Sequence, residues 1–165
     1  MSDAFAPLTC PTPDATAGFA AALARHLGPG DTLLLKGGIG AGKTLFARSL
    51  IQKRLADVGL YEDVPSPTFT LVQTYSDGSV ELWHADLYRL NAAPDLAELG
   101  LDEAFATSIC LIEWPELLGD LAPTDALTIE FAETSDNARV LHFTGPSRWA
   151  SVIAAASQSV QVPHD

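Results

Sequence analysis

The sequence predicts an α/β fold, in which helices flank a mixed sheet of parallel core strands and antiparallel hairpins. Two short runs, 32–35 and 109–112, are almost wholly apolar, which is typical of parallel strands buried on both faces. The first run leads directly into a glycine-rich loop and then into a helical pattern. Elsewhere, pairs of strand-like segments flank short polar turns and predict hairpins.

The first half of the chain predicts two helices, an extended loop and a hairpin. Thr12 and the proline after it open the first helix, and apolar residues at helical spacing predict the second from 43 to about 57. Two prolines make 64–67 a rigid, extended loop. Strands at 69–75 and 80–86 are expected to pair across an Asp-Gly turn.

The second half predicts further strands and a terminal helix. Short helices are expected between 94 and 105, before the buried strand at 109–112. Strands at 127–131 and 140–143 can pair across a polar turn, and a final helix is expected from Ser147. Parallel core strands and two hairpins together make one mixed sheet.

The glycine-rich loop carries the clearest chemical signal. Residues 37–44 read Gly-Gly-Ile-Gly-Ala-Gly-Lys-Thr and match the phosphate-binding pattern G-x-x-x-x-G-K-[ST]. In such a loop, main-chain N–H groups surround phosphate oxygens, Lys43 reaches the β- and γ-phosphates, and Thr44 ligates Mg²⁺. We therefore expect a P-loop NTPase-like sheet that binds and hydrolyses ATP. The expected nucleotide contacts are Gly38, Ile39, Gly40, Ala41, Gly42, Lys43, Thr44 and Leu45.

Two carboxylates compete for the metal. Glu113 ends the most apolar run, where a parallel strand beside the P-loop strand would deliver it, and we favour it for Mg²⁺, directly or through water. The alternative for Glu113 is a cap on the turn before Pro115. Asp86 ends a more polar strand and is expected to support the metal site or to orient the attacking water. Its alternatives are solvation or an ion pair with Arg89.

Hydroxyl and ring side chains provide weaker signals. Thr68 lies on a stiff segment after the P-loop helix, where NTPases often keep a loop that senses the γ-phosphate, and we assign it that contact. An ordinary proline-bounded turn fits the same residues. His84 is expected to be a half-buried structural histidine rather than a ligand. The tryptophans, Trp83, Trp114 and Trp149, are expected to serve packing.

Size and composition favour one compact domain in the cytoplasm. A chain of 165 residues has the usual size of a single domain. We expect 1–150 to form one P-loop ATPase domain and 151–165 to form the end of the last helix and a tail. No apolar run approaches the roughly 20 residues of a membrane span, and the N-terminus lacks a signal-peptide pattern. Cys10 and Cys110 are expected to be reduced thiols.

The charge balance argues against unaided binding to nucleic acid. Nine Lys and Arg residues face 21 Asp and Glu residues, which gives a net charge of -12 and repels a phosphate backbone. Direct tight binding to nucleic acid is therefore not expected. Five of the nine basic residues cluster around the P-loop and its helix, which makes this segment the local anion site: Lys36, Lys43, Arg48, Lys53 and Arg54.

Four segments in order resemble one family, that of TsaE, formerly YjeE, the small ATPase of bacterial tRNA threonylcarbamoyladenosine synthesis. Besides 37–44, they are Ser-Pro-Thr-Phe-Thr-Leu-Val at 66–72, His-Ala-Asp-Leu-Tyr-Arg-Leu at 84–90 and Leu-Ile-Glu-Trp-Pro at 111–115. The resemblance spans about 12–145. The family usually has Asp and Leu where this chain has Gly38 and Ile39, so a role of that aspartate does not carry over.

The resemblance implies an ATPase that supports a complex of TsaB and TsaD, which transfers a threonylcarbamoyl group to adenosine in certain tRNAs. It also implies that Thr44 and Glu113 hold Mg²⁺, that the loop around Thr68 is a switch, and that Thr16 lies on the adenine side. Lys43 and Asp86 would act in catalysis. Two other functions fit a P-loop chain, a nucleotide-gated binding module without turnover and a small-molecule kinase. Few arginines remain for a kinase lid.

Overall fold

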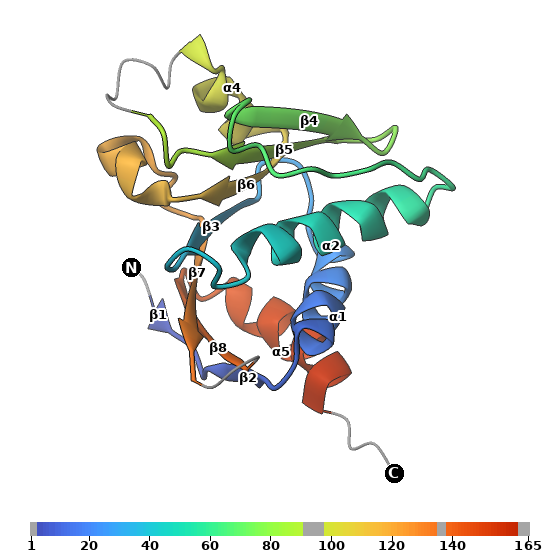
Figure 1. The fold of residues 1–165 in the computed structure, drawn as a ribbon, viewed down its shortest axis with the longest axis vertical. Coiled ribbons are helices and arrows are strands. Elements are labelled where there is room, and N and C mark those ends of the chain that lie inside the picture. Colours follow the sequence, from blue (N-terminus) through green and yellow to red (C-terminus); the bar gives the residue numbers. More distant parts are fainter. Residues whose placement is uncertain (1–2, 91–97, 135–137, 162–165) are drawn as a thin grey trace.

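The structure, a computed structural model, describes residues 3–90, 98–134 and 138–161. Its strands form one sheet in the order β1-β8-β7-β3-β6-β5-β4, with β2 also paired to β8 (Figure 1). The strands are β1 (Asp3–Ala4), β2 (Leu8–Cys10), β3 (Thr32–Lys36), β4 (Val72–Ser76), β5 (Glu81–Asp86), β6 (Ile109–Glu113), β7 (Leu127–Glu133) and β8 (Arg139–Gly145). The helices are α1 (Pro13–Ala24), α2 (Lys43–Ala56), α4 (Leu101–Thr107), α5 (Trp149–Gln161) and the 3-10 helix η1 (Pro115–Leu121).

Helices cover both faces of the sheet, and each face has its own apolar core. Helices α1, α2 and α5 pack on one face, and α4 and η1 pack on the other. Strand β3 is buried on both faces, because Leu33 and Leu35 join the first core while Leu34 joins the second. Within the described residues, no helix has the length and apolar character needed to cross a membrane.

The register of the parallel strands brings the ends of three strands together. Strand β3 pairs in parallel with β6, with Leu35 opposite Glu113, and β6 pairs in parallel with β5, with Glu113 opposite Asp86. Because side chains alternate along a strand, Glu113 shares the face of Leu111, and Asp86 shares the face of Leu82. Both leucines belong to the core under α1 and α2. The two carboxylates therefore end adjacent strands on the α2 side.

The predicted α/β fold class is confirmed, and most of its elements form where they were expected. The predicted hairpin strand at 69–75 begins only at Val72, because 68–70 forms a turn. The main-chain N–H of Leu71 donates to the carbonyl of Pro67 at 2.8 Å, and Leu71 has a left-handed φ of 70°. The Leu71 carbonyl still accepts from the Asp86 N–H at 2.9 Å, but its own N–H is bonded to Pro67, so the β4 ladder begins at Val72.

Other boundaries differ by a few residues. Short helices were expected between 94 and 105, and helix α4 runs from Leu101 to Thr107. The part of that region at 94–97 lies outside the described residues. The last helix starts at Trp149 rather than at Ser147. The residues before it form a turn, in which the Trp149 N–H donates to the carbonyl of Pro146. Strands β1 and β2 and the helix η1 were not anticipated. The boundary at residue 150 was expected to lie within the last helix, and the division into one domain and a tail stays a prediction.

Arg54 near the end of α2 joins three parts of the chain. One guanidinium nitrogen donates to the carbonyl oxygens of Ala24 and Leu27 at 3.0 and 2.7 Å, where α1 ends. The other two nitrogens donate to Asp77 Oδ2 at 3.2 and 2.9 Å, in the turn between β4 and β5. Arg54 therefore fixes α1 and the hairpin to α2.

The Asp77 carboxylate is strongly stabilised in its charged form. Burial alone would raise its pKa, but hydrogen bonds from the N–H groups of Ser79 and Val80, the Ser79 hydroxyl and Arg54 lower the pKa of Asp77 to about 2. A carboxylate in the unfolded chain has a pKa near 4. Its contribution to stability is thus complete above pH 4 and is lost as the pH falls toward 2.

Replacing Asp77 should therefore have a pH-dependent cost. We expect Asp77→Asn to lower the free energy of unfolding at pH 7 by about 2 kcal/mol, the value of a pKa lowered by nearly two units. Urea unfolding at pH 7 and at pH 2.5 measures this difference, which should shrink at the lower pH. A difference that stays constant with pH would show that the charge of Asp77 contributes nothing.

Candidate nucleotide site

The loop between β3 and α2 requires glycine at several positions. Gly37, Gly40 and Gly42 have φ values of 147°, 78° and 108°, a region that other residues rarely adopt. At Gly37, an added Cβ would lie 2.9 Å from the carbonyl oxygen of Phe131 in β7. The loop at 37–42 can therefore turn closely over the sheet and enter α2 at Lys43 only because these residues lack side chains.

Lys43 lies at the first turn of α2 and is held over the loop. Its ammonium donates to the carbonyl oxygens of Gly37 and Gly38 at 2.6 and 2.8 Å. The ammonium also lies 4.1 Å from the centroid of the Trp114 ring, within the range of a cation–π contact. Burial lowers the pKa of Lys43, and the negative charge of nearby Glu113 opposes this change. The ammonium is thus positioned beside the loop that would receive phosphates.

The next residue, Thr44, contacts the expected metal ligand. Its hydroxyl is 2.9 and 3.0 Å from the two carboxylate oxygens of Glu113, to which it donates. Glu113 is 3% exposed and ends β6 beside β3, as its apolar run predicted. Its carboxylate faces Thr44 and His84 rather than the turn at Pro115. A hydroxyl and a carboxylate thus meet at the start of α2.

Asp86 lies next to Glu113, as its register partner on the neighbouring strand. Asp86 is 5% exposed and accepts hydrogen bonds from the Thr68 hydroxyl at 3.2 Å and from the main-chain N–H of Tyr88 at 3.0 Å. The hydroxyls of Thr68 and Ser66 are 2.6 Å apart. The segment with Thr68 is therefore joined directly to the second carboxylate of the site.

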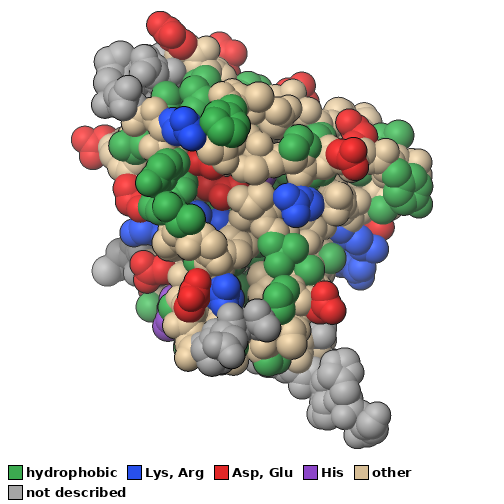
Figure 2. Space-filling model, in the orientation of Figure 1, with side chains coloured by type: hydrophobic (Ala, Val, Ile, Leu, Met, Phe, Trp, Pro, Cys, Tyr) green, Lys and Arg blue, Asp and Glu red, His purple; other side chains and the backbone are tan. Residues whose placement is uncertain are grey.

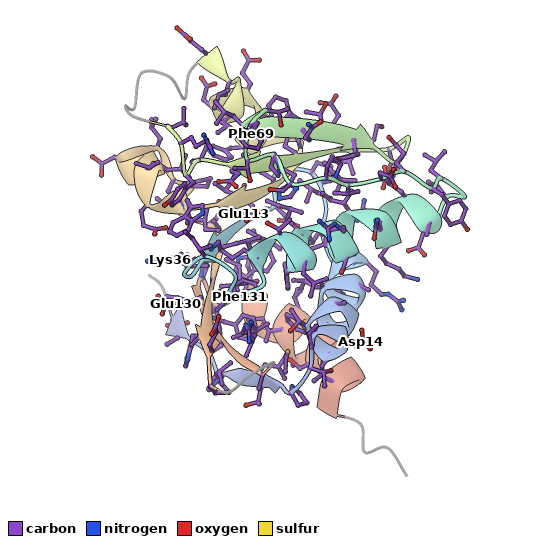
Figure 3. All side chains as sticks on the ribbon, in the orientation of Figure 1. Asp14, Lys36, Phe69, Glu113, Glu130 and Phe131 are labelled. Carbon is purple, nitrogen blue, oxygen red and sulfur yellow. The ribbon has the colours of Figure 1, made fainter. Side chains whose placement is uncertain are left out.

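Arg89 makes a different contact from the ion pair considered above. Its guanidinium lies 4.5 Å from the centroid of the Phe69 ring, and no ion pair with Asp86 is present among the described residues. Phe69 and Glu113 are labelled in Figure 3. Figure 2, drawn from the same side, shows acidic side chains in a recess beside hydrophobic side chains.

Two cavities border the loop. One has a volume of about 230 Å³ and is lined by Ile39, Gly40, Lys43, Thr44, Thr68, Asp86, Tyr88, Arg89, Glu113 and Trp114. The other has a volume of about 340 Å³ and is lined by Gly40, Ala41, Gly42, Lys43, Thr44, Leu45, Glu113 and Arg139. Gly38 lines neither cavity and contributes its carbonyl to Lys43. All the other residues assigned to the P-loop contacts line at least one of them.

Thr16 lies apart from this group. It is 1% exposed on α1, and its side chain lies beside the Cys10 thiol. Neither cavity at the P-loop includes Thr16 among its lining residues. Its proposed contact with adenine stays a prediction.

Sequence reasoning missed the positions of two aromatic side chains. His84 is fully buried rather than half-buried, and its Nε2 is 2.6 Å from Glu113 Oε2. Trp114 packs partly on the second core, as expected, but it also lines the first cavity, where its ring contacts Lys43 and Tyr88. The sequence did contain one signal that His84 belongs to the site. His84 stands two positions before Asp86, and residues two apart on a strand share a face.

Arg139 of β8 holds the loop from its other side. Its Nε donates to the carbonyl of Ala41 at 2.9 Å, and a terminal nitrogen donates to the carbonyl of Gly40 at 3.2 Å. Gly40 lines both cavities, and Ala41 lines the second. The residues lie almost a hundred positions apart in the sequence, so only the strand order β8-β7-β3 brings them together.

Comparisons with known proteins point to one family. The family model described as Threonylcarbamoyl adenosine biosynthesis protein TsaE matches residues 10–141. The tRNA threonylcarbamoyladenosine biosynthesis protein TsaE of Rickettsia bellii is 38% identical over 129 residues, 78% of this chain and 88% of that protein. The protein of that name from Bacillus subtilis is 37% identical over 133 residues, 80% of each chain. A crystal structure of Bacillus subtilis YdiB matches with a TM-score of 0.74 at 29% identity and covers 96% of both chains.

The contacts of Arg139 predict how the loop responds to its loss. We expect Arg139→Ala to accelerate amide hydrogen exchange in 37–42 by about tenfold, since it removes two charge-assisted hydrogen bonds from partly exposed carbonyls. Exchange measured by mass spectrometry tests this. Arg25→Ala is the control, because it removes the same charge from an exposed position at the end of α1. Equal exchange rates in the two variants would contradict the role of Arg139.

Proposed function

Because the chain belongs to the TsaE family, we propose that it binds ATP with Mg²⁺ and hydrolyses it in support of threonylcarbamoyladenosine synthesis on tRNA. The observation that carries this proposal is the contact of the Thr44 hydroxyl with the buried Glu113 carboxylate, directly after the glycine loop and Lys43. A simple turn into a helix needs neither a buried lysine nor a carboxylate from another strand at this point.

The loop and the start of α2 would bind the phosphates. Main-chain N–H groups at a helix N-terminus attract anions, and the helix dipole adds to this attraction. The Lys43 ammonium lies on the carbonyls of Gly37 and Gly38 and would move to the β- and γ-phosphate oxygens. There it would balance the negative charge that develops as the γ-phosphate leaves.

Thr44 and Glu113 would hold the metal. Mg²⁺ prefers oxygen ligands and is usually bound through one or two carboxylates together with substrate phosphates. In the described part of the chain, no cluster of three or more His, Cys, Asp or Glu side chains could hold a metal ion. One hydroxyl and one carboxylate beside a triphosphate suit this ion without such a cluster. When bound, Mg²⁺ would neutralise charge on the phosphate oxygens.

Asp86 would place the attacking water. The water oxygen bonds to the γ-phosphorus in line with the breaking bond to the β,γ-bridging oxygen, and the products are ADP, phosphate and a proton. Asp86 lies beside Glu113 on the neighbouring strand and can accept a hydrogen bond from that water. Its contact with Thr68 would connect the attack to the position of the loop at 66–70.

The same loop supports coupling to a TsaB and TsaD complex. Phe69 is 81% exposed next to Thr68, and Ile39 is 77% exposed at the edge of the first cavity. Large exposed apolar side chains at a cavity rim suit a protein partner. With a net charge of -12, the chain would approach tRNA through such partners rather than by itself.

Substitution of the two carboxylates should separate metal binding from catalysis. We expect Glu113→Gln to raise the Mg²⁺ concentration needed for nucleotide binding by at least tenfold, since it removes a charged ligand. Asp86→Asn should leave that concentration nearly unchanged and slow phosphate release by about a hundredfold. Titration calorimetry and a phosphate-release assay measure both quantities, and Lys43→Ala should lose nucleotide binding. The opposite ranking of the carboxylates would reverse their roles.

Partner complexes should stimulate hydrolysis through the Thr68 loop. We expect TsaB and TsaD together to accelerate phosphate release by about tenfold, a usual size for coupling between sites. Thr68→Val should lose most of this stimulation because it removes the hydroxyl that donates to Asp86. Thr70→Val is the matched control, since its hydroxyl accepts from the Gln73 side-chain amide and, within the described residues, makes no contact with Asp86. No phosphate release, even in a single turnover with both partners, would instead indicate a nucleotide-gated binding module.

A further inference from the structure

His84 occupies an unusual place for a polar side chain. It lies within β5, which pairs with strands on both sides, and it is fully buried. Its neighbours on the strand, Trp83 and Ala85, pack into the second core. His84 itself faces the opposite side of the sheet, toward Glu113, whose Oε2 lies 2.6 Å from its Nε2. Apart from this contact, nothing in the described chain explains a histidine at this position.

The contact determines which ring nitrogen carries the proton. Nδ1 of His84 is buried and has no hydrogen-bond partner among the described residues. If the neutral ring carried its proton on Nδ1, a buried N–H would be unsatisfied, and Nε2 and the carboxylate would face each other as two acceptors. The geometry therefore assigns the Nε2–H tautomer, in which His84 donates to Glu113.

The two donors to Glu113 hold its carboxylate differently. The Thr44 hydroxyl is nearly equidistant from both oxygens, at 2.9 and 3.0 Å, so it does not select one of them. His84 contacts Oε2 alone. Because β5 and β6 are joined by a parallel ladder, this donor is fixed relative to the strand that carries Glu113. The Thr44 hydroxyl, in contrast, would have to give up its bond to Glu113 to turn its oxygen toward a metal.

We propose that His84 is a positioning residue that holds Oε2 of Glu113 and leaves Oε1, with the Thr44 hydroxyl, for the metal of the bound nucleotide. This inference rests on the proposed function, since it concerns the Mg²⁺ site of the same pocket. Hydrogen bonds to a ligating carboxylate fix its orientation, and their loss typically weakens metal affinity about 10- to 100-fold. His84 contributes by its Nε2–H donor and not only by its shape.

Two amide substitutions separate the donor from the shape. The side-chain nitrogen of Gln can occupy the place of Nε2, whereas that of Asn reaches only the place of Nδ1. We therefore compare His84→Gln, His84→Asn and the wild-type protein. Calorimetry gives the dissociation constant of a non-hydrolysable ATP analogue, once in Mg²⁺ and once in EDTA. The constant in EDTA divided by the constant in Mg²⁺ is the gain in affinity from the metal.

We expect His84→Gln to keep a wild-type gain and His84→Asn to lose about tenfold of it, with unchanged affinity in EDTA. A wild-type gain in both variants would overturn the proposal. Equal losses of affinity in EDTA and in Mg²⁺ would also overturn it, because they indicate general damage to the pocket. If wild-type protein binds the analogue with no gain from Mg²⁺, the proposed metal site itself fails, which is a distinct result.

A second measurement needs no variant with Asn and decides the matter if that variant does not fold. Long-range proton–nitrogen correlation spectra of the wild-type protein report the tautomer of each histidine, and His84→Gln identifies the signal of His84. An Nε2–H tautomer that persists when Mg²⁺ and the analogue bind supports the proposal. An Nδ1–H tautomer in the nucleotide-bound protein overturns it.

Discussion

The register of three parallel strands determines where the polar chemistry of this chain is located. Leu35 pairs with Glu113, and Glu113 pairs with Asp86. Both carboxylates therefore lie at the carboxyl ends of the parallel strands, where the glycine loop leaves β3. A shift of one residue in the pairing of β6 would turn Glu113 to the face of α4 and η1. The start of α2 would then have no carboxylate beside Thr44. Such a shift is opposed because it would bury the Glu113 carboxylate away from the Thr44 hydroxyl and the His84 ring, the groups that donate to it.

The shape of the loop depends on a different part of the sheet. Gly37 passes so close to Phe131 of β7 that a side chain does not fit, and Arg139 of β8 donates to the carbonyls of Gly40 and Ala41. Both contacts come from the antiparallel hairpin of β7 and β8, on the side of β3 away from β6. The site therefore has two supports, since β5 and β6 supply its carboxylates while the hairpin fixes its main chain.

Local signals in the sequence predicted much of this arrangement and failed where contacts are distant. The strand, loop and helix around Lys43 follow from apolar pattern and glycine spacing, and Glu113 follows from its place after an apolar run. The contacts of His84 and Arg139 required the strand order, which no short pattern contains. Strands β1 and β2 are too short for periodicity to mark them. The turn before Val72 depends on a left-handed leucine, which residue type does not predict.

Lys43 and Glu113, the two charged side chains at the start of α2, already have hydrogen-bond partners within the described chain, and this bears on the proposed binding of a nucleotide. An unpaired lysine or carboxylate would be costly at this burial, and here Lys43 donates to loop carbonyls while Glu113 accepts from Thr44 and His84. In the proposed function, a triphosphate with Mg²⁺ would therefore replace these contacts with its own. Lys43 would pass from carbonyls to phosphate, and Thr44 from carboxylate to metal. The contact of His84 with Glu113 would need no exchange, because the ring is held on β5, the strand next to that of Glu113.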